Sequence, residues 1–126
     1  MVEDGNYKNL IVWQKSIRLV KILYQLTANF PGEEKFGLIS QMRRAAVSVP
    51  SNIAEGQARR TTADYIRFVS IAEGSLAEVE TQLIIAIDLG FCSESDTQEI
   101  FGLLTEVRKM LNALRRSLSA KLTRTE

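Results

Sequence analysis

The residues best suited to chemistry in this sequence lie on two polar rows with helical spacing. The first row contains Gln41, Ala45, Ser48, Asn52 and Glu55, and the second contains Ile71, Ser75, Glu78 and Gln82. Residues spaced by three and four lie on one face of a helix, so two packed helices can bring these rows together. Glu55 and Glu78 would then share a cleft and shift each other's pKa, with Arg44 beside them. Such a carboxylate pair is the only arrangement here that favours acid–base catalysis.

A structural role for the same rows is the favoured interpretation. The residues assigned to this polar network are Gln41, Arg43, Arg44, Ser48, Asn52, Glu55, Ser75, Glu78 and Glu80. We expect Arg43 or Arg44 to pair with a glutamate of the second row, and the serine hydroxyls to bond across the small side chains. A buried polar group without its partner costs roughly 1 to 3 kcal/mol. A network of this kind would therefore fix helix register and partner choice, while a small-ligand site is the alternative.

The composition argues against most catalytic and cofactor chemistry. The chain has no histidine and one cysteine, so it cannot assemble a Cys/His zinc site or the Glu-x-x-His motifs of a di-metal bundle. No phosphate-binding glycine loop is present. Cys92 has no histidine to activate it, and we interpret it as an incidental loop thiol. We expect neither an enzyme nor a cofactor.

Charges are segregated along the chain, although the net charge is only +1. Residues 6–32 and 107–125 contain cations and no acid, whereas residues 61–100 contain eight acids and the single cation Arg67. Clustered cations attract the phosphate backbone whatever its sequence. The candidate nucleic-acid contacts are Lys15, Arg18, Lys21, Arg59, Arg60, Arg108, Lys109, Arg115, Arg116 and Lys121. The alternative is that these cations are ordinary solvated faces, since no aromatic residues interleave with them.

Four amphipathic segments must position these residues. Apolar spacing predicts helices over about 7–29, 33–57, 62–89 and 95–122, with no strand. Thr62 is expected to cap the third helix and Gly90 to end it, with Ser95 and Asp96 capping the fourth. Pro50 predicts a kink in the second helix, or two shorter helices. The 126 residues fit one domain, an all-α antiparallel four-helix bundle with left-handed up-down-up-down topology.

The sequence also indicates in which cellular compartment the protein is expected. No uncharged run approaches the ~20 residues that a membrane span needs. The first residues are acidic rather than basic, which is unlike a signal peptide. Because the single cysteine has no partner for a disulfide, we expect a cytoplasmic protein in reducing conditions, with no membrane partner.

Several ordered motifs resemble those of one known family. They are Leu10-Ile-Val-Trp-Gln14, Asn29-Phe-Pro31, Gly37-Leu-Ile-Ser-Gln-Met-Arg-Arg-Ala-Ala46, Ser48-Val-Pro-Ser-Asn-Ile-Ala-Glu-Gly56 and Ala72-Glu-Gly-Ser-Leu-Ala-Glu-Val-Glu80. Over nearly its whole length the chain resembles the four-helix bundle proteins encoded in intervening sequences of bacterial 23S ribosomal RNA genes. The resemblance implies a homopentamer with a central channel and no established activity. It extends to the accessory proteins of diversity-generating retroelements, whose strongly basic pentamer is thought to bind nucleic acid and a reverse transcriptase. The balanced charge of this chain departs from that pattern.

These observations lead to one expected function and one alternative. We expect a non-catalytic homo-oligomeric scaffold, pentameric by resemblance, that contacts RNA or a ribonucleoprotein through the cations of the first and fourth helices. The alternative is a protein-interaction module that binds no nucleic acid. In that case the acidic third helix would dock a basic protein partner or the basic ends of a neighbouring subunit.

Overall fold

The computed structural model describes residues 6–125, which form four α-helices and no strand. The helices are α1 (Ile11–Thr27), α2 (Leu38–Gln57), α3 (Thr62–Asp88) and α4 (Gln98–Thr125). Single 3-10 turns over Tyr7–Asn9, Gly32–Glu34 and Ser95–Thr97 precede α1, α2 and α4. The expectation of an all-α chain with four helices is therefore confirmed.

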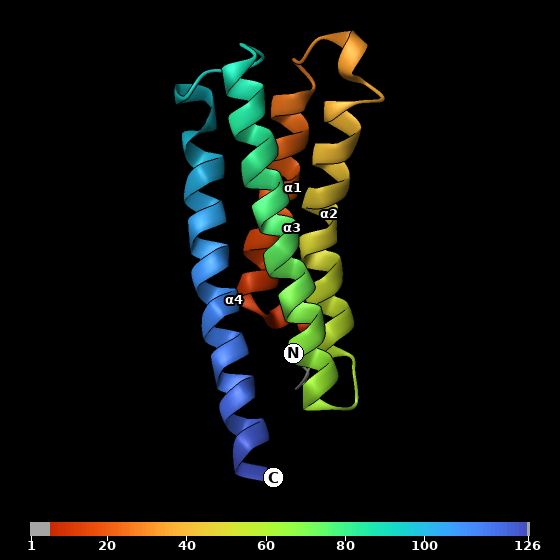
Figure 1. Cartoon of the computed structure of the whole chain (residues 1–126), viewed down its shortest axis with the longest axis vertical. Coiled ribbons are helices and arrows are strands. Elements are labelled where there is room, and N and C mark those ends of the chain that lie inside the picture. Colours follow the sequence, from red (N-terminus) through yellow and green to blue (C-terminus); the bar gives the residue numbers. More distant parts are fainter. Residues whose placement is uncertain (1–5, 126) are drawn as a thin grey trace.

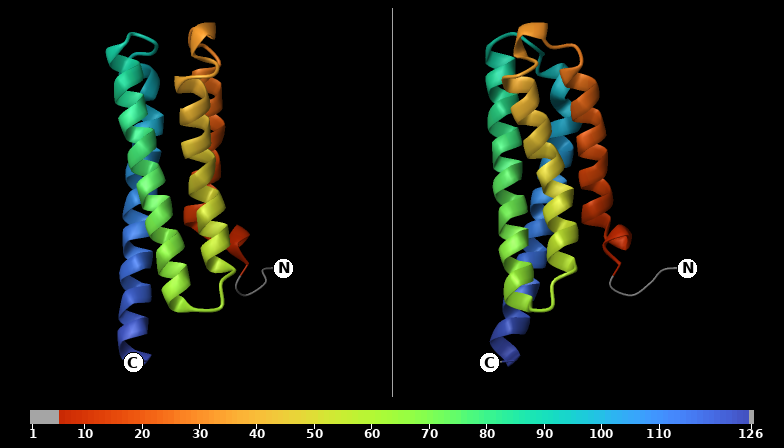
Figure 2. Two further views of the ribbon diagram at one scale, coloured as in Figure 1. Left: turned by 45° about the vertical axis from the view of Figure 1, so that its right-hand side comes forward. Right: turned by 90° about the vertical axis from the view of Figure 1, so that its right-hand side faces the viewer.

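The four helices lie side by side, and each runs back along the one before it (Figures 1 and 2). In Figure 1 the α1–α2 and α3–α4 connections lie at the upper end, and the α2–α3 turn lies at the lower end. The last turns of α4 reach below that turn in both figures. Segments far apart in the sequence thus meet at the same end of the molecule.

The core is built from the apolar rows that the sequence places on each helix. Its fully buried large side chains include Leu19 of α1, Met42 of α2, Leu76 and Leu83 of α3, and Leu104 of α4. Burying an aliphatic side chain of this size contributes about 1.5 to 3 kcal/mol, so these rows hold the helices together. No helix in the described range is both long and apolar enough to cross a membrane.

Helix α2 begins later than its sequence predicts and is not interrupted. Glu34 belongs to the preceding 3-10 turn, and its carboxylate accepts a hydrogen bond from the backbone N–H of Leu38 at 3.2 Å. It thereby caps a helix that we expected to begin at Glu33. Pro50 is buried inside α2, which continues to Gln57. The alternative of two shorter helices is therefore wrong, and a kink at Pro50 stays a prediction.

Helix α3 is capped by Thr61 rather than by Thr62. The Thr61 hydroxyl accepts a hydrogen bond from the backbone N–H of Asp64 at 3.1 Å. Thr61 has extended backbone angles, which leave its side chain free to fold back over the first turn, whereas Thr62 is already helical. The expected N-cap was therefore wrong by one residue.

Gly90 ends α3 in the way that its position predicts. Its φ of 78° lies in the left-handed region that favours glycine. The N–H of Gly90 donates to the carbonyl of Ile87, and the N–H of Phe91 donates to that of Ala86, both at 2.9 Å. These two bonds form a Schellman motif, which turns the chain sharply away from α3.

The start of α4 is held by Ser93 and Asp96 together. The Ser93 hydroxyl accepts from the N–H of Asp96, and the Asp96 carboxylate accepts from the N–H of Ser93, each at 3.1 Å. This reciprocal pair is a capping box. Ser95 and Asp96 lie inside the 3-10 turn that leads into α4, so neither is the N-cap that we expected, and Ser93 accepts the capping bond instead.

Candidate functional site

A directed chain of hydrogen bonds joins the two polar rows at their centre. Ser75 donates to the carbonyl of Ile71 at 3.1 Å, so its Oγ must accept from Ser48, 2.8 Å away. Ser48 in turn accepts from Nδ2 of Asn52 at 2.8 Å, and the same Nδ2 donates to the Ser48 carbonyl at 2.7 Å. The structure thus brings Ser48, Asn52 and Ser75 together between α2 and α3, and each hydroxyl both donates and accepts.

Replacing Ser48 with alanine tests this chain. The Ser48→Ala variant loses the bonds from Asn52 and to Ser75, but Asn52 keeps the Ser48 carbonyl and Ser75 keeps the Ile71 carbonyl. We therefore expect the free energy of unfolding in urea to fall by only about 1 kcal/mol. The matched control is Ser51→Ala, an exposed serine of the same helix, with an expected change below about 0.5 kcal/mol. Equal effects for the two variants would contradict a stabilising role for the chain.

At Gly56 the helices α2 and α3 approach each other closely. A Cβ atom built on Gly56 would lie 2.8 Å from Cβ of Phe68, 3.0 Å from Cδ1 of Tyr65 and 3.3 Å from the Tyr65 carbonyl oxygen. Burial at this crossing also raises the pKa of the Tyr65 phenol. The glycine is required here because no side chain fits between the two helices.

A groove of about 290 Å³ lies between α2 and α3, and it extends from Ser48 and Ser75 in the direction away from Gly56. Its lining residues are Gln41, Arg44, Ala45, Ser48, Ser75, Glu78 and Gln82. Gln82 is only 9% exposed, and its Oε1 is buried without a hydrogen-bond partner among the described residues. Arg44 and Glu78, both exposed, form no ion pair within that part of the chain. The groove is thus lined by a hydrogen-bond acceptor without a donor, Oε1 of Gln82, and by two unpaired charges of opposite sign, Arg44 and Glu78.

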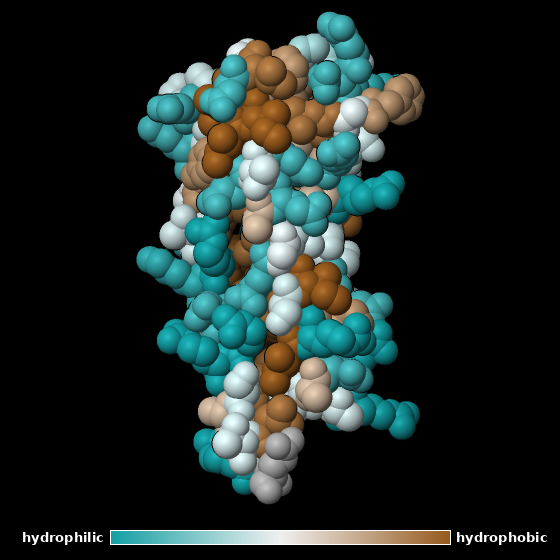
Figure 3. Space-filling model, viewed as in Figure 1, coloured by the Kyte–Doolittle hydropathy of each residue, from teal (hydrophilic) through white to brown (hydrophobic). Residues whose placement is uncertain are grey.

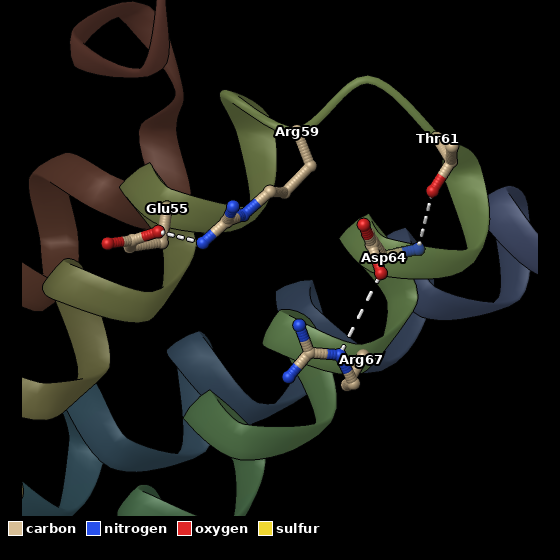
Figure 4. A network of polar contacts seen from close by, with 5 residues as sticks. All are labelled: Glu55, Arg59, Thr61, Asp64 and Arg67. Carbon is tan, nitrogen blue, oxygen red and sulfur yellow. Dashed lines mark hydrogen bonds and ion pairs between the residues drawn. The ribbon is translucent and has the colours of Figure 1, made fainter.

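The carboxylate pair proposed for catalysis does not form. Glu55 pairs with Arg59, with 2.6 Å between the carboxylate and guanidinium (Figure 4). Gly56, its neighbour, packs at Phe68, which precedes Glu78 by ten residues on α3. At 1.5 Å per residue, ten residues span about 15 Å of helix, so Glu55 and Glu78 lie too far apart to share a cleft.

The arginine–glutamate pairs expected between the two rows are also not found. Arg43 reaches α1 instead, where its guanidinium donates to the Thr27 hydroxyl at 2.9 Å and to the Tyr24 carbonyl at 3.2 Å. It also lies over the Tyr24 ring, 4.3 Å from the ring centroid. Glu80 pairs with Arg108 of α4 at 2.8 Å. Arg43 therefore ties α2 to the end of α1, and Glu80 ties α3 to α4.

Five of the ten candidate nucleic-acid contacts are engaged by acids. The pairs are Lys15 with Glu106, Arg18 with Glu99, Arg59 with Glu55, Arg108 with Glu80 and Arg115 with Glu73. Four of these pairs join different helices, and the fifth lies within α2 and its C-terminal turn. Half of the predicted basic face of α1 and α4 is therefore neutralised, because acids of α3 and α4 lie opposite these four cations.

Some of the remaining cations lie at the lower end of the molecule, and others lie elsewhere. Among the described residues, the cations that form no ion pair are Lys8, Lys21, Lys35, Arg43, Arg44, Arg60, Lys109, Arg116 and Arg124. The α2–α3 turn and the last turns of α4 lie at the lower end in Figures 1 and 2. We call this region the basic end, defined by Arg59, Arg60, Arg116, Lys121 and Arg124.

Arg67 and Phe68, near the basic end, were not among the site residues that the sequence predicted. Arg59 and Arg67 both lie over the ring of Phe68, at 4.6 Å and 4.5 Å from its centroid. Arg67 also lies 3.9 Å from the Asp64 carboxylate, as Figure 4 shows. The sequence shows an arginine beside an aromatic residue at Arg67-Phe68, which could have indicated a cation–π contact. The stacking of Arg59 on Phe68, however, depends on the turn between α2 and α3. These contacts restrain the turn that carries Arg60.

Cys92 is poorly suited to nucleophilic chemistry. Partial burial raises the pKa of its thiol, and the nearby Asp96 carboxylate raises it further, because both disfavour the thiolate. Among residues 6–124, no three histidine, cysteine, aspartate or glutamate side chains are placed to hold a metal ion.

The raised pKa predicts slow alkylation. At pH 7.5 we expect Cys92 to react with iodoacetamide more slowly than free cysteine, since less thiolate is present. Asp96→Asn removes the carboxylate charge but not the burial, so it should restore part of the rate. Mass spectrometry of timed samples measures both rates. Reaction as fast as that of free cysteine would show that the thiolate is not disfavoured.

The fold and these contacts define an all-α protein of four helices. A family model for the 23S rRNA-intervening sequence proteins matches residues 8–113, and the chain belongs to this family. A solved structure from Bacteroides thetaiotaomicron, described as a protein of unknown function from the S23 ribosomal protein family, is similar with a TM-score of 0.74. It is 27% identical, and the match covers 83% of this chain and 98% of that one. No curated protein matches. Family and neighbour thus carry no assigned activity.

Proposed function

We propose that this chain is a non-catalytic, cytoplasmic, homo-oligomeric scaffold that contacts RNA or a ribonucleoprotein through its basic end. Each copy is a single left-handed up-down-up-down bundle, and the family resemblance favours five copies. The observation that carries the proposal is that uncompensated cations from two separate segments lie at the same end of the bundle. Arg60 belongs to the α2–α3 turn and Arg116 and Arg124 belong to the last turns of α4, and none of the three has an acid paired to it in residues 6–124.

Assembly is supported by the unsatisfied face of α2 and α3. Gln82 there has a buried oxygen without a donor, and Arg44 and Glu78 lack opposite charges. Ile71 and Ile85 are large apolar side chains that remain exposed on α3. A buried acceptor without a hydrogen bond costs roughly 1 to 3 kcal/mol. An assembly in which a neighbouring copy donates a hydrogen bond to Gln82 would be stabilised, because that cost is removed.

RNA contact is supported by the chemistry of arginine at the basic end. Guanidinium groups bind phosphate oxygens in a bidentate way, and their attraction does not depend on base sequence. Lys15, Arg18, Arg108 and Arg115 form ion pairs with acids. The proposed RNA contact therefore lies at the basic end of the bundle and not along the faces of α1 and α4.

The test compares two double charge reversals of equal size. Arg116→Glu/Arg124→Glu changes the basic end, while Lys21→Glu/Lys109→Glu changes unpaired cations away from it. We expect the first variant to lose about tenfold or more in affinity for total cellular RNA at low salt, and the second to lose much less. Filter retention at two salt concentrations measures binding. Equal retention by both variants would remove RNA contact from the proposal.

Light scattering of the same samples measures assembly separately. At the higher salt concentration we expect a mass about five times the 14.2 kDa of one chain, unchanged by either reversal. A monomeric mass at micromolar concentration would overturn the scaffold. An assembled protein whose mass does not shift with RNA would instead favour the alternative, a module that binds proteins only.

A further inference from the structure

The end of the molecule opposite the basic end carries an apolar hollow with an acidic edge. The hollow measures about 460 Å³ and is lined by Ile84, Ile87, Asp88, Glu94, Thr97, Gln98 and Phe101. Beside it Leu89 is 60% exposed, and Ile84 on its wall is 49% exposed. Figure 3 shows hydrophobic surface gathered over the upper part of the molecule, where α3 ends. Exposed apolar surface framed by polar residues is typical of a contact site.

The charges at this hollow are uncompensated. Asp88 and Glu94 form no ion pair with any residue in the described range 6–124. Asp96 lies on the same connection, and hydrogen bonds from Ser93 lower the pKa of its carboxylate, which favours its charged form. Nucleic acid is excluded as an occupant, because its phosphates would be repelled. The hollow therefore suits a segment that combines cations with apolar side chains.

The last turns of α4 are a segment of this kind. Arg116, Lys121 and Arg124 are exposed there and Leu122 is half-buried, while Leu118 packs partly against the core of its own copy. Figures 1 and 2 show these turns reaching past the α2–α3 turn, so their sides are open to another molecule. The charge of this segment is opposite to that of the hollow.

The two surfaces cannot meet within one copy. They lie at opposite ends of α4, whose 28 residues span about 42 Å. We propose that the end of α4 of one copy docks in the α3–α4 hollow of a second copy. The cations face Asp88 and Glu94, and Leu122 lies against Ile84 and Phe101. Because the two contacting surfaces differ, the contact is heterologous and can repeat from copy to copy, or from one assembly to the next.

The experiment follows mass by sedimentation velocity as concentration rises, at about 20 mM and about 300 mM salt. The wild-type protein is expected to grow beyond its basic assembly at the lower salt and much less at the higher. Asp88→Lys/Glu94→Lys and Arg116→Glu/Arg124→Glu should each abolish the growth. An equimolar mixture should recover a contact, because the first variant keeps the cationic helix end and the second keeps the acidic hollow.

Two further variants separate charge from shape. Ile84→Ser should weaken the growth without changing any charge, and Lys21→Glu/Lys109→Glu should leave it unchanged although it shifts the net charge as far as the α4 variant. Growth that persists in Asp88→Lys/Glu94→Lys, or a mixture that recovers nothing, would overturn the proposal. A wild type that never grows but binds a synthetic peptide of residues 107–126 would also overturn it, and would assign the hollow to a helix of another protein.

A failure of the docking contact can be distinguished from a failure of the proposed RNA contact. Asp88→Lys/Glu94→Lys is expected to keep its RNA affinity, because the basic end is intact. Loss of growth with retained RNA binding supports the docking contact, whereas growth without any RNA binding leaves the docking contact in place and removes the RNA contact alone.

Discussion

Gly56→Ala is expected to lower the free energy of unfolding by about 2 kcal/mol, because the added methyl group overpacks the crossing of α2 and α3. The methyl carbon would lie 2.8 Å from Cβ of Phe68 and 3.3 Å from the Tyr65 carbonyl oxygen. Neither atom is the end of a flexible side chain, so a helix must move to relieve the contact. Urea unfolding followed by circular dichroism measures the loss.

Gly74 is the matched control for this substitution. It also lies inside a helix, but a Cβ atom there meets nothing within 4 Å. Gly74→Ala is expected to raise stability by up to about 1 kcal/mol, since alanine favours the helix over glycine by that amount. Opposite signs for the two variants would show that the requirement at position 56 is steric. A neutral Gly56→Ala would contradict the close approach.

Leu76→Ala is expected to have the largest effect, a loss of about 3 kcal/mol in the free energy of unfolding. Leu76 is fully buried near the middle of α3, and its truncation removes buried apolar area and leaves a cavity. Leu89→Ala, at the end of the same helix, is the control. Because Leu89 is 60% exposed, its loss should cost less than about 0.5 kcal/mol.

The two leucine variants also separate stability from association. Leu89 lies beside the acidic hollow, so Leu89→Ala should weaken the growth in mass at low salt without weakening the fold. A large loss of stability in Leu89→Ala would mean that the residue packs inside its own copy, and it would count against an open contact surface at this end.

The four helices could be predicted because apolar spacing is a local property. Leu19, Met42, Leu76 and Leu104 lie on rows that repeat every three or four residues, and all are buried. The helix starts were less accurate, since capping is decided by single backbone bonds. The carboxylate of Glu34, which suits a first helical turn, accepts the N–H of Leu38 from outside the helix.

The cations predicted to bind nucleic acid could not be sorted from the sequence into paired and unpaired ones. Residues 6–32 contain no acid, yet Arg18 meets Glu99, which follows it by 81 residues. Charge counted along the chain cannot detect such a pair, because pairing depends on which helices pack together and in what register. Gln82 was placed on the polar row by its spacing, but its lack of a partner is visible only in the packed structure.

The separation of charge along the bundle has a consequence for any ring of these chains. Rotation about an axis parallel to the helices carries the same end of every copy to the same side. Such a ring would carry Arg60 and Arg124 on one rim and Asp88 and Glu94 on the other. If the proposed RNA contact holds, a polynucleotide would approach the ring from the side of Arg60 and Arg124 rather than from the side of Asp88 and Glu94.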